Sequence, residues 1–203
     1  LVSSFLTRLF NTNRNEKVSL GEIKAITDQG EKEGIVNEHE GSMIDNLLDL
    51  KSLKVEEIMT PRSVVFRVPS LMSVDEFFSQ EDYESFSRIP VYENTVDTIT
   101  GMVLLRTLMI EKLKGNIEVT MQELAIPIFK INENIPVSKA LKLFIKRKEH
   151  IFLVQDNFGQ TEGVVSLEDT IETVLGAEIV DEFDNVEDMQ SFAKLKMRQK
   201  NRH

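Results

Sequence analysis

The chain repeats itself from Val55 onward, and this internal repeat constrains the fold more than any other feature. A repeat of this length is the mark of one supersecondary unit built twice. Three pairs of segments match in the same order, namely "VEEIMTP" (55–61) with "MQELAIP" (121–127), "SRIPVYE" (87–93) with "EHIFLVQ" (149–155), and "GMVLLRT" (101–107) with "GVVSLED" (163–169).

Each repeat alternates between strand and helix patterns. In the second repeat, "IFKIN", "HIFLVQ" and "TEGVVS" are strand candidates, and "VSKALKLFIKRK" and "LEDTIETVL" have helical spacing. The first repeat gives the same order with "SVVFRV", "SVDEFFSQ", "RIPVYE", "TITGMVLL" and "RTLMIEKL". We predict an α/β fold of two β-α-β-β-α repeats, with helices covering one side of each sheet.

The first 54 residues are predicted to be helical. Ser19 with Glu22, and Asn37 with Glu40, have the spacing of capping boxes. Glycines 30 and 34 are expected to separate the two helices. We interpret this part as a short helical segment that precedes the repeats and has no catalytic role.

Composition excludes several classes of function. The formal charge of −10 argues against general nucleic-acid binding, which depends on neutralising phosphates. The absence of cysteine excludes disulfides, Cys-ligated zinc and thiol catalysis, and it fits a reducing compartment. No stretch reaches the roughly 18 consecutive apolar residues that a membrane span requires.

Gly163, Ser166 and Asp169 recur every third residue where a predicted strand becomes a predicted helix. One interpretation is structural, with Ser166 and Asp169 as a helix-capping pair and Gly163 at a tightly packed position. The other is a ligand site. Glycine lets a ligand approach the backbone, a helix N-terminus presents free N–H groups, and a carboxylate accepts hydrogen bonds from hydroxyls.

The repeated unit, with its apolar-Pro start and Gly-x-x-Ser-x-x-Asp end, resembles the cystathionine-β-synthase (CBS) domain, which occurs in tandem pairs. More narrowly, "EEIMTPRSVV" and "SRIPVYE", preceded by "EHEGSMIDNLLDL" and followed by "LGAEIVDEFD", resemble the CNNM/CorC family of membrane proteins linked to magnesium transport. This resemblance implies a homodimer at the cytoplasmic face of the cell membrane, although the fragment itself is expected to be soluble. It divides the chain into a helical linker after a missing membrane domain (1–54), CBS repeat 1 (55–116), CBS repeat 2 (117–178) and a C-terminal tail (179–203).

The resemblance also implies a nucleotide site. In CBS pairs the Gly-x-x-Ser-x-x-Asp pattern binds the ribose of an adenine nucleotide, which assigns Gly163, Ser166 and Asp169 to ribose binding, with ATP and magnesium or AMP as the ligand. The matching residues of the first repeat are Gly101, Leu104 and Thr107, which lack both polar groups, so one site per chain is expected.

The opposite repeat is expected to supply the other wall of the cleft, from Thr60 and Pro61 and from Ser87, Arg88, Ile89 and Pro90. Adenine would lie against Ile89 and Pro90. Arg88 and His150, taken to be at matching places in the two repeats, are candidates for phosphate contact. The structural alternatives are that Thr60 caps a turn, Pro90 marks a strand irregularity, and His150 serves packing.

No catalytic triad, Walker A loop, His-Glu-x-x-His motif or calcium-loop pattern occurs, so we predict neither catalysis nor a metal site. The leading hypothesis is a regulatory module that binds an adenine nucleotide and controls an attached membrane transporter of magnesium or another divalent cation. The alternative is a purely structural dimerisation module with an empty cleft. The acidic-to-basic tail is interpreted as a surface helix and frayed end or as a contact with anionic lipid.

Overall fold

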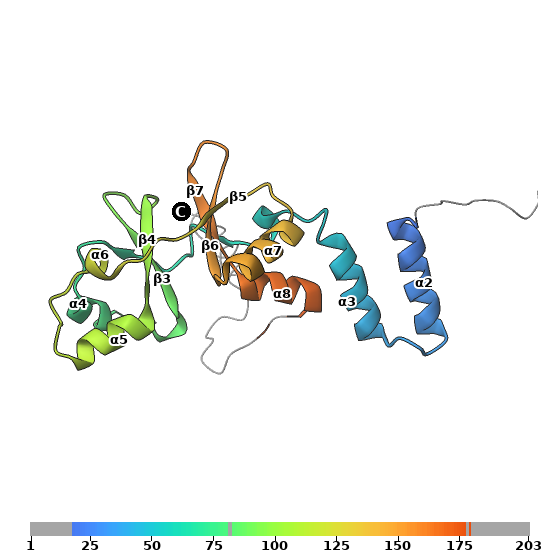
Figure 1. Cartoon of the computed structure of the whole chain (residues 1–203), viewed down its shortest axis with the longest axis horizontal. Helices are drawn as coiled ribbons and strands as arrows, with labels where there is room; N and C mark the ends of the chain where they lie inside the picture. The colour runs from blue at the N-terminus through green and yellow to red at the C-terminus, as the bar shows by residue number, and fades with distance from the viewer. Residues whose placement is uncertain (1–17, 81–82, 178, 180–203) are drawn as a thin grey trace, which may run out of the picture. The chain divides into compact units, whose positions relative to one another are not determined.

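The computed structural model describes residues 18–80, 83–177 and 179 (Figure 1). Residues 1–17 of the predicted helical segment, and the C-terminal tail apart from residue 179, lie outside these residues. The chain divides into two compact units, Leu1–Leu48 and Asp49–His203. Among the described helices, none combines the length and apolar character that crossing a bilayer requires.

The first unit contains the two helices that the capping patterns predicted. Helix α2 (Leu20–Lys32) begins at Ser19, whose Oγ accepts a hydrogen bond from the backbone N–H of Glu22 at 3.2 Å. Helix α3 (Glu38–Asp49) begins after Asn37, whose Oδ1 accepts from the N–H of Glu40 at 2.9 Å. The expectation that glycines 30 and 34 both separate the helices was wrong for Gly30, which lies within the last turn of α2, where glycine is tolerated. Gly34 does lie between the helices, at a φ of 74°.

The second unit contains two sheets with the predicted β-α-β-β-α order in each repeat. The first repeat gives β2 (Val68–Pro69), α4 (Val74–Phe78), β3 (Arg88–Tyr92), β4 (Ile99–Leu104) and α5 (Leu105–Leu113). The second gives β5 (Lys130–Asn132), α7 (Val137–Arg147), β6 (Ile151–Gln155), β7 (Thr161–Ser166) and α8 (Leu167–Leu175). In both repeats the first strand pairs in parallel with the second, and the second pairs antiparallel with the third.

The helices of the second repeat cover one face of its sheet, as Figure 1 shows for α7 and α8. Phe144 on α7 stacks on Phe152 of β6, with ring centroids 3.9 Å apart, and both side chains are buried. The strongly amphipathic α7 leaves its lysines on the solvent side. Burial of these apolar faces is the main stabilising contribution.

The lead-in segments of the two repeats, residues 54–61 and 120–127, are exchanged between the sheets. The first forms a 3-10 turn, η1 (Val55–Glu57), and then β1 (Thr60–Pro61), which pairs antiparallel with β7 of the second repeat. The second forms α6 (Met121–Leu124) and then pairs Ile126 with Met102 of the first repeat. Each lead-in segment therefore adds to the sheet of the other repeat. The two segments that match in the sequence, "VEEIMTP" and "MQELAIP", thus occupy equivalent places in the structure.

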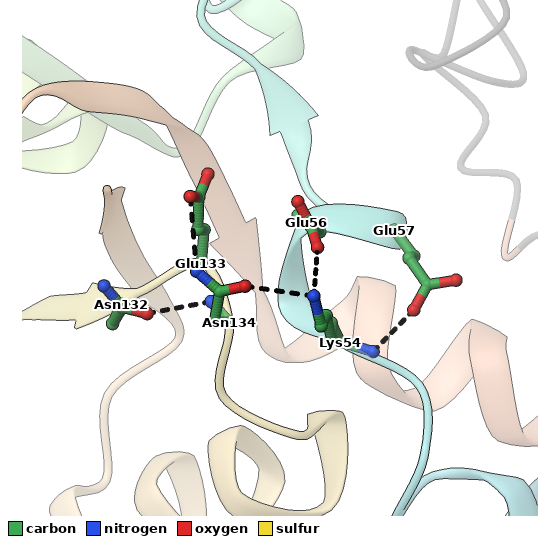
Figure 2. Close-up of polar contacts among 6 residues, drawn as sticks. All are labelled: Lys54, Glu56, Glu57, Asn132, Glu133 and Asn134. Atoms are coloured by element: carbon green, nitrogen blue, oxygen red, sulfur yellow. Dashed lines mark hydrogen bonds and ion pairs between the residues drawn. The ribbon is translucent and has the colours of Figure 1, made fainter. Parts of the chain in front are cut away.

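Polar contacts fasten the first lead-in segment to the second repeat (Figure 2). The Nζ of Lys54 donates to Glu56 Oε1 at 2.9 Å and to Asn134 Oδ1 at 3.0 Å, and the N–H of Glu56 donates to the carbonyl of Glu133 at 3.1 Å. The neighbouring Glu56 carboxylate raises the pKa of Lys54. Buried Val55 adds an apolar anchor in the core of the second repeat.

A third apolar cluster joins the two sheets of the second unit. Met102 of β4 packs with Leu153 of β6 and Val164 of β7, together with Ile99 and Ile128. The two repeats are thus connected both by exchanged strands and by buried side chains.

The pairing registers correct one alignment made from the sequence. Leu105 N–H donates to the carbonyl of Ser87 at 3.1 Å, and Leu167 N–H donates to that of His150 at 2.9 Å. His150 therefore corresponds to Ser87, and Arg88 corresponds to Ile151, so placing Arg88 and His150 at matching positions was wrong by one residue. The sequence alignment had matched Ile89 with Ile151, whereas register is set by the partner strand, and a one-residue shift exchanges the faces.

Candidate functional site

The candidate site is built at the junction of β7 and α8. Ser166 ends the strand with an extended backbone, at φ −99° and ψ 166°, and caps the helix. Its Oγ accepts a hydrogen bond from the N–H of Asp169 at 2.9 Å, and Asp169 Oδ2 accepts from the N–H of Ser166 at 2.7 Å. The spacing of Ser166 and Asp169 therefore forms a capping box, as the structural interpretation predicted.

This capping role uses only part of the carboxyl group. Among the described residues, Asp169 Oδ1 accepts no hydrogen bond. Asp169 itself is partly buried. One oxygen thus holds the helix N-terminus while the other retains its capacity to accept hydrogen bonds from a ligand.

The pKa of Asp169 is unusually high. The pKa is raised to about 7, chiefly by burial and to a smaller extent by the nearby carboxylates of Glu172 and Glu168, while the two hydrogen bonds with Ser166 act to lower it. At neutral pH the group therefore exists in both protonation states. A ligand that hydrogen-bonds through hydroxyl donors would favour the ionised form.

The exchanged strand β1 runs directly beside Gly163. Pro61 pairs with Gly163 and Thr60 with Val164, and the N–H of Arg62 donates to the carbonyl of Glu162 at 2.8 Å. The structure thus brings Thr60 and Pro61 next to Gly163, although they are about a hundred positions apart in the sequence. β1 is an edge strand, where a proline is tolerated because no partner requires its missing N–H.

The close approach of β1 accounts for the glycine. A β-carbon on residue 163 would collide with the carbonyl oxygen of Thr60. The same close approach explains Gly101 in the first repeat, where a β-carbon would lie 2.7 Å from the carbonyl oxygen of Ile126. The recurrence of glycine at this position therefore follows from the strand exchange in both repeats, whether or not a ligand is present.

The first repeat lacks the polar cap. Leu104 occupies the N-cap position of α5 and provides no side-chain hydrogen bond there. Thr107, at the place of Asp169, carries no charge. The two equivalent helix N-termini therefore differ in chemistry, and only the one at α8 presents a hydroxyl and a carboxyl group together.

The four candidates on the first repeat have different exposures. Ser87 is exposed, and Arg88 is partly buried with no side-chain hydrogen bond or ion pair among the described residues. Ile89 is fully buried in the core of its repeat, and Pro90 is also buried. Contact between adenine and Ile89 would consequently have to involve its backbone. No hydrogen bond or ion pair among the described residues connects these four positions to Ser166 or Asp169.

His150 lies beside the first turn of α8. Its Nδ1 is 3.8 Å from Glu168 Oε1, and its side chain is 47% exposed. Sequence reasoning missed Glu168 as a neighbour of this site, although the adjacent acidic pair in "SLED" was a signal. No group of three His, Cys, Asp or Glu side chains suited to a metal ion occurs within residues 18–80, 83–177 and 179.

Comparisons with known proteins identify the family of this chain. Residues 118–176 match the family model of the CBS domain. A solved structure of the CBS domain of a bacterial CNNM/CorC family Mg2+ transporter is 34% identical to this chain, with a TM-score of 0.73, and the match covers 81% of this chain and 100% of the other. The chain belongs to the CNNM/CorC family. It represents the CBS-domain region of that family, which confirms the resemblance and the predicted fold.

Two further relatives bear on function. The CBS domain of the bacterial CNNM/CorC family Mg2+ transporter has also been solved in complex with ATP, at 31% identity and a TM-score of 0.63, over 67% of this chain and 96% of the other. The UPF0053 protein sll1254 of Synechocystis is 32% identical over 86% of this chain and 50% of its own length. This chain therefore spans about half the length of that curated relative.

Proposed function

We propose that this CNNM/CorC chain is a non-catalytic regulatory CBS pair that binds one adenine nucleotide. The ligand proposed first is ATP with magnesium. Ser166 and Asp169 would bind the ribose, Gly163, Thr60 and Pro61 would line the adjoining wall, and Ser87, Arg88, Pro90 and His150 would contribute to the base and phosphate ends. The observation that carries this proposal is the Asp169 carboxyl group, which has one oxygen in the capping box and one that accepts no hydrogen bond from the described residues.

Two further facts support it. A relative 31% identical to this chain is known in complex with ATP. The first repeat lacks both polar groups at the equivalent helix N-terminus, so we expect one nucleotide per chain.

In the full-length protein, we propose that nucleotide binding controls an attached membrane transporter of magnesium or another divalent cation. The chain would lie at the cytoplasmic face of the membrane and act as a homodimer. Bound nucleotide would shift the equilibrium between two arrangements of the paired CBS domains, to the extent that it binds one of them more tightly. The first lead-in segment, fastened by Lys54, would transmit that shift toward the preceding helices.

The second candidate function is a structural dimerisation module with no ligand. The capping box favours it, because helix capping alone explains Ser166 and Asp169. Thermal unfolding with ATP, ADP and AMP, each with and without magnesium, separates the two functions. A ligand that binds only the folded chain raises its melting temperature. If none of these nucleotides changed the melting temperature at millimolar concentration, the structural function would be preferred.

A further inference from the structure

A pocket of about 470 Å³ lies at the opposite end of β7 from Ser166. Thr161 at the start of β7 lines it, whereas Ser166 ends the strand. Five residues of strand separate the two positions by roughly 17 Å. Its volume falls within the range of small-molecule sites. It is therefore separate from Ser166 and Asp169, while its lining residues Arg62 and Thr161 adjoin Pro61 and Gly163.

Both repeats contribute equivalent positions to this pocket. The N–H of Glu93 donates to the carbonyl of Thr98, and the N–H of Asp156 donates to the carbonyl of Gln160, each at 3.0 Å. Thr98 and Gln160 thus hold the same place in the two β-hairpins, and both line the pocket. The pocket lies where the matching ends of the hairpins meet, so a ligand in it would contact both repeats.

The pocket concentrates positive charge in an acidic chain. Arg62 and Lys130 both line it, and neither is within ion-pair distance of a carboxylate among the described residues. Among the described residues, the Arg62 guanidinium has one long hydrogen bond, from Nη1 to the carbonyl of Thr161 at 3.4 Å. Arg67 is close by, since its Nη1 donates to the carbonyl of Arg62 at 2.6 Å. Asp97 is the one carboxylate among the described lining residues, so the local balance is positive while the chain carries −10.

We propose that this pocket binds an oxyanion, meaning the phosphate or carboxylate group of a small molecule. The planar guanidinium of Arg62 can donate two parallel hydrogen bonds to such a group, and Lys130 adds a second positive charge. The side-chain amide of Gln160 provides a neutral donor, and the hydroxyl of Thr98 provides a second when Thr95 is the donor in the 2.8 Å hydrogen bond between their hydroxyls. This chemistry differs from that of Asp169, which can accept hydrogen bonds from sugar hydroxyls but repels anions.

Because the ligand contacts both hairpins, it stabilises the arrangement in which the two repeats form this pocket. If a nucleotide at Asp169 favours the same arrangement of the repeats, the two ligands strengthen each other's binding. If the nucleotide favours another arrangement, each ligand weakens the binding of the other. The oxyanion proposal does not depend on the nucleotide proposal, because the described lining residues of the pocket include neither Ser166 nor Asp169.

The test is a set of backbone amide NMR titrations with inorganic phosphate, citrate and ATP, each at constant ionic strength, with sodium chloride as the reference. Phosphate or citrate is expected to shift the amide signals of Thr98, Gln160 and Thr161 in a saturable way and to leave those of Ser166 and Asp169 unchanged. Phosphate and citrate distinguish the two oxyanion types. Shifts no larger than those from sodium chloride, for both probes, would overturn the proposal.

Three variants with the same change of charge make the test specific. Arg62→Gln and Lys130→Gln are each expected to weaken binding of the effective probe by about 10-fold or more, because each removes a charged contact. Lys139→Gln on the exposed face of α7 is the matched control and should leave affinity unchanged. Equal affinity in all three variants would show nonspecific attraction and contradict the site. Melting temperatures of the variants, measured without ligand, verify that each is folded.

Discussion

The backbone carbonyl of Thr60 occupies the space that a side chain on Gly163 would need. This contact joins the lead-in segment of the first repeat to the last strand of the second. The same relationship holds between Ile126 and Gly101. Each lead-in segment therefore approaches the backbone of the other repeat closely at a glycine.

Gly163→Ala is expected to destabilise the second unit by roughly 1 to 3 kcal/mol, because the new methyl group must displace the backbone of β1. Gly101→Ala should have a similar effect through Ile126. Urea unfolding monitored by circular dichroism measures both. A wild-type midpoint for Gly163→Ala would show that β1 does not pack as described.

The raised pKa of Asp169 predicts a pH-dependent stability. Its ordinary pKa is 3.8, whereas the folded value is about 7, so between these values the folded chain keeps a proton that the unfolded chain releases. The free energy of unfolding should therefore fall as pH rises from about 4 to 7, by up to about 1.4 kcal/mol per pH unit from this group, and change no further above 7.

Asp169→Asn removes this titration while keeping an oxygen that can accept from Ser166. The difference in unfolding free energy between wild type and Asp169→Asn, measured from pH 5 to pH 8, isolates the contribution. The variant should gain stability relative to wild type as pH rises. A constant difference across that range would contradict the burial of the carboxyl group.

The proposed homodimer has a candidate surface on α5. Met109 and Ile110 are each more than 40% exposed, and Leu113 is 88% exposed, which leaves an apolar strip that the described residues do not cover. Sedimentation velocity at micromolar concentration should give twice the chain mass of 23.3 kDa. Leu113→Glu is expected to shift the population toward monomer, whereas Phe158→Glu, at an equally exposed hairpin tip, should not. A wild-type mass of one chain would exclude the dimer.

ATP affinity should improve with magnesium. The chain's charge of −10 repels a bare polyphosphate, and a bound divalent cation offsets part of that repulsion. For the same reason, ATP affinity in chelator should increase with added salt, because salt screens the repulsion between the chain and the polyphosphate. Calorimetry in magnesium and in chelator compares the two conditions, and equal affinities would contradict this electrostatic explanation.

The internal repeat was sufficient to predict the order of strands and helices in both repeats, although the first strand, predicted at residues 63–68, is observed as β2 at Val68–Pro69. The exchange of lead-in strands between the two repeats was harder to predict from the sequence. β1 is two residues long, includes a proline and shows no alternation, so nothing local connects Thr60 with Val164. Only the family resemblance placed the two segments together.

Register and burial limited the prediction of the site. Arg88 and His150 were misaligned by one residue because β3 and β6 each contain three consecutive buried residues. Two such strands align almost equally well when one is shifted by a residue. Ile89 was assigned to adenine from its place in "SRIP", but its side chain is in the core, which the sequence does not reveal because both faces of β3 are apolar. The capping interpretation of Ser166 and Asp169, one of the two alternatives drawn from the sequence, was correct, since capping depends on residues three apart.

The most direct test of nucleotide binding at α8 is the affinity of Asp169→Ala for ATP with magnesium, measured by calorimetry beside Thr107→Ala. If the free carboxylate oxygen binds ribose hydroxyls, Asp169→Ala loses hydrogen bonds worth roughly 1.5 to 3 kcal/mol, which corresponds to a 10- to 100-fold weaker affinity. Loss of the cap lowers stability by about 1 kcal/mol, so both titrations are made well below the melting temperature. We predict this weakening for Asp169→Ala and wild-type affinity for Thr107→Ala. Wild-type affinity in Asp169→Ala would contradict the ribose role and leave the residue as a helix cap.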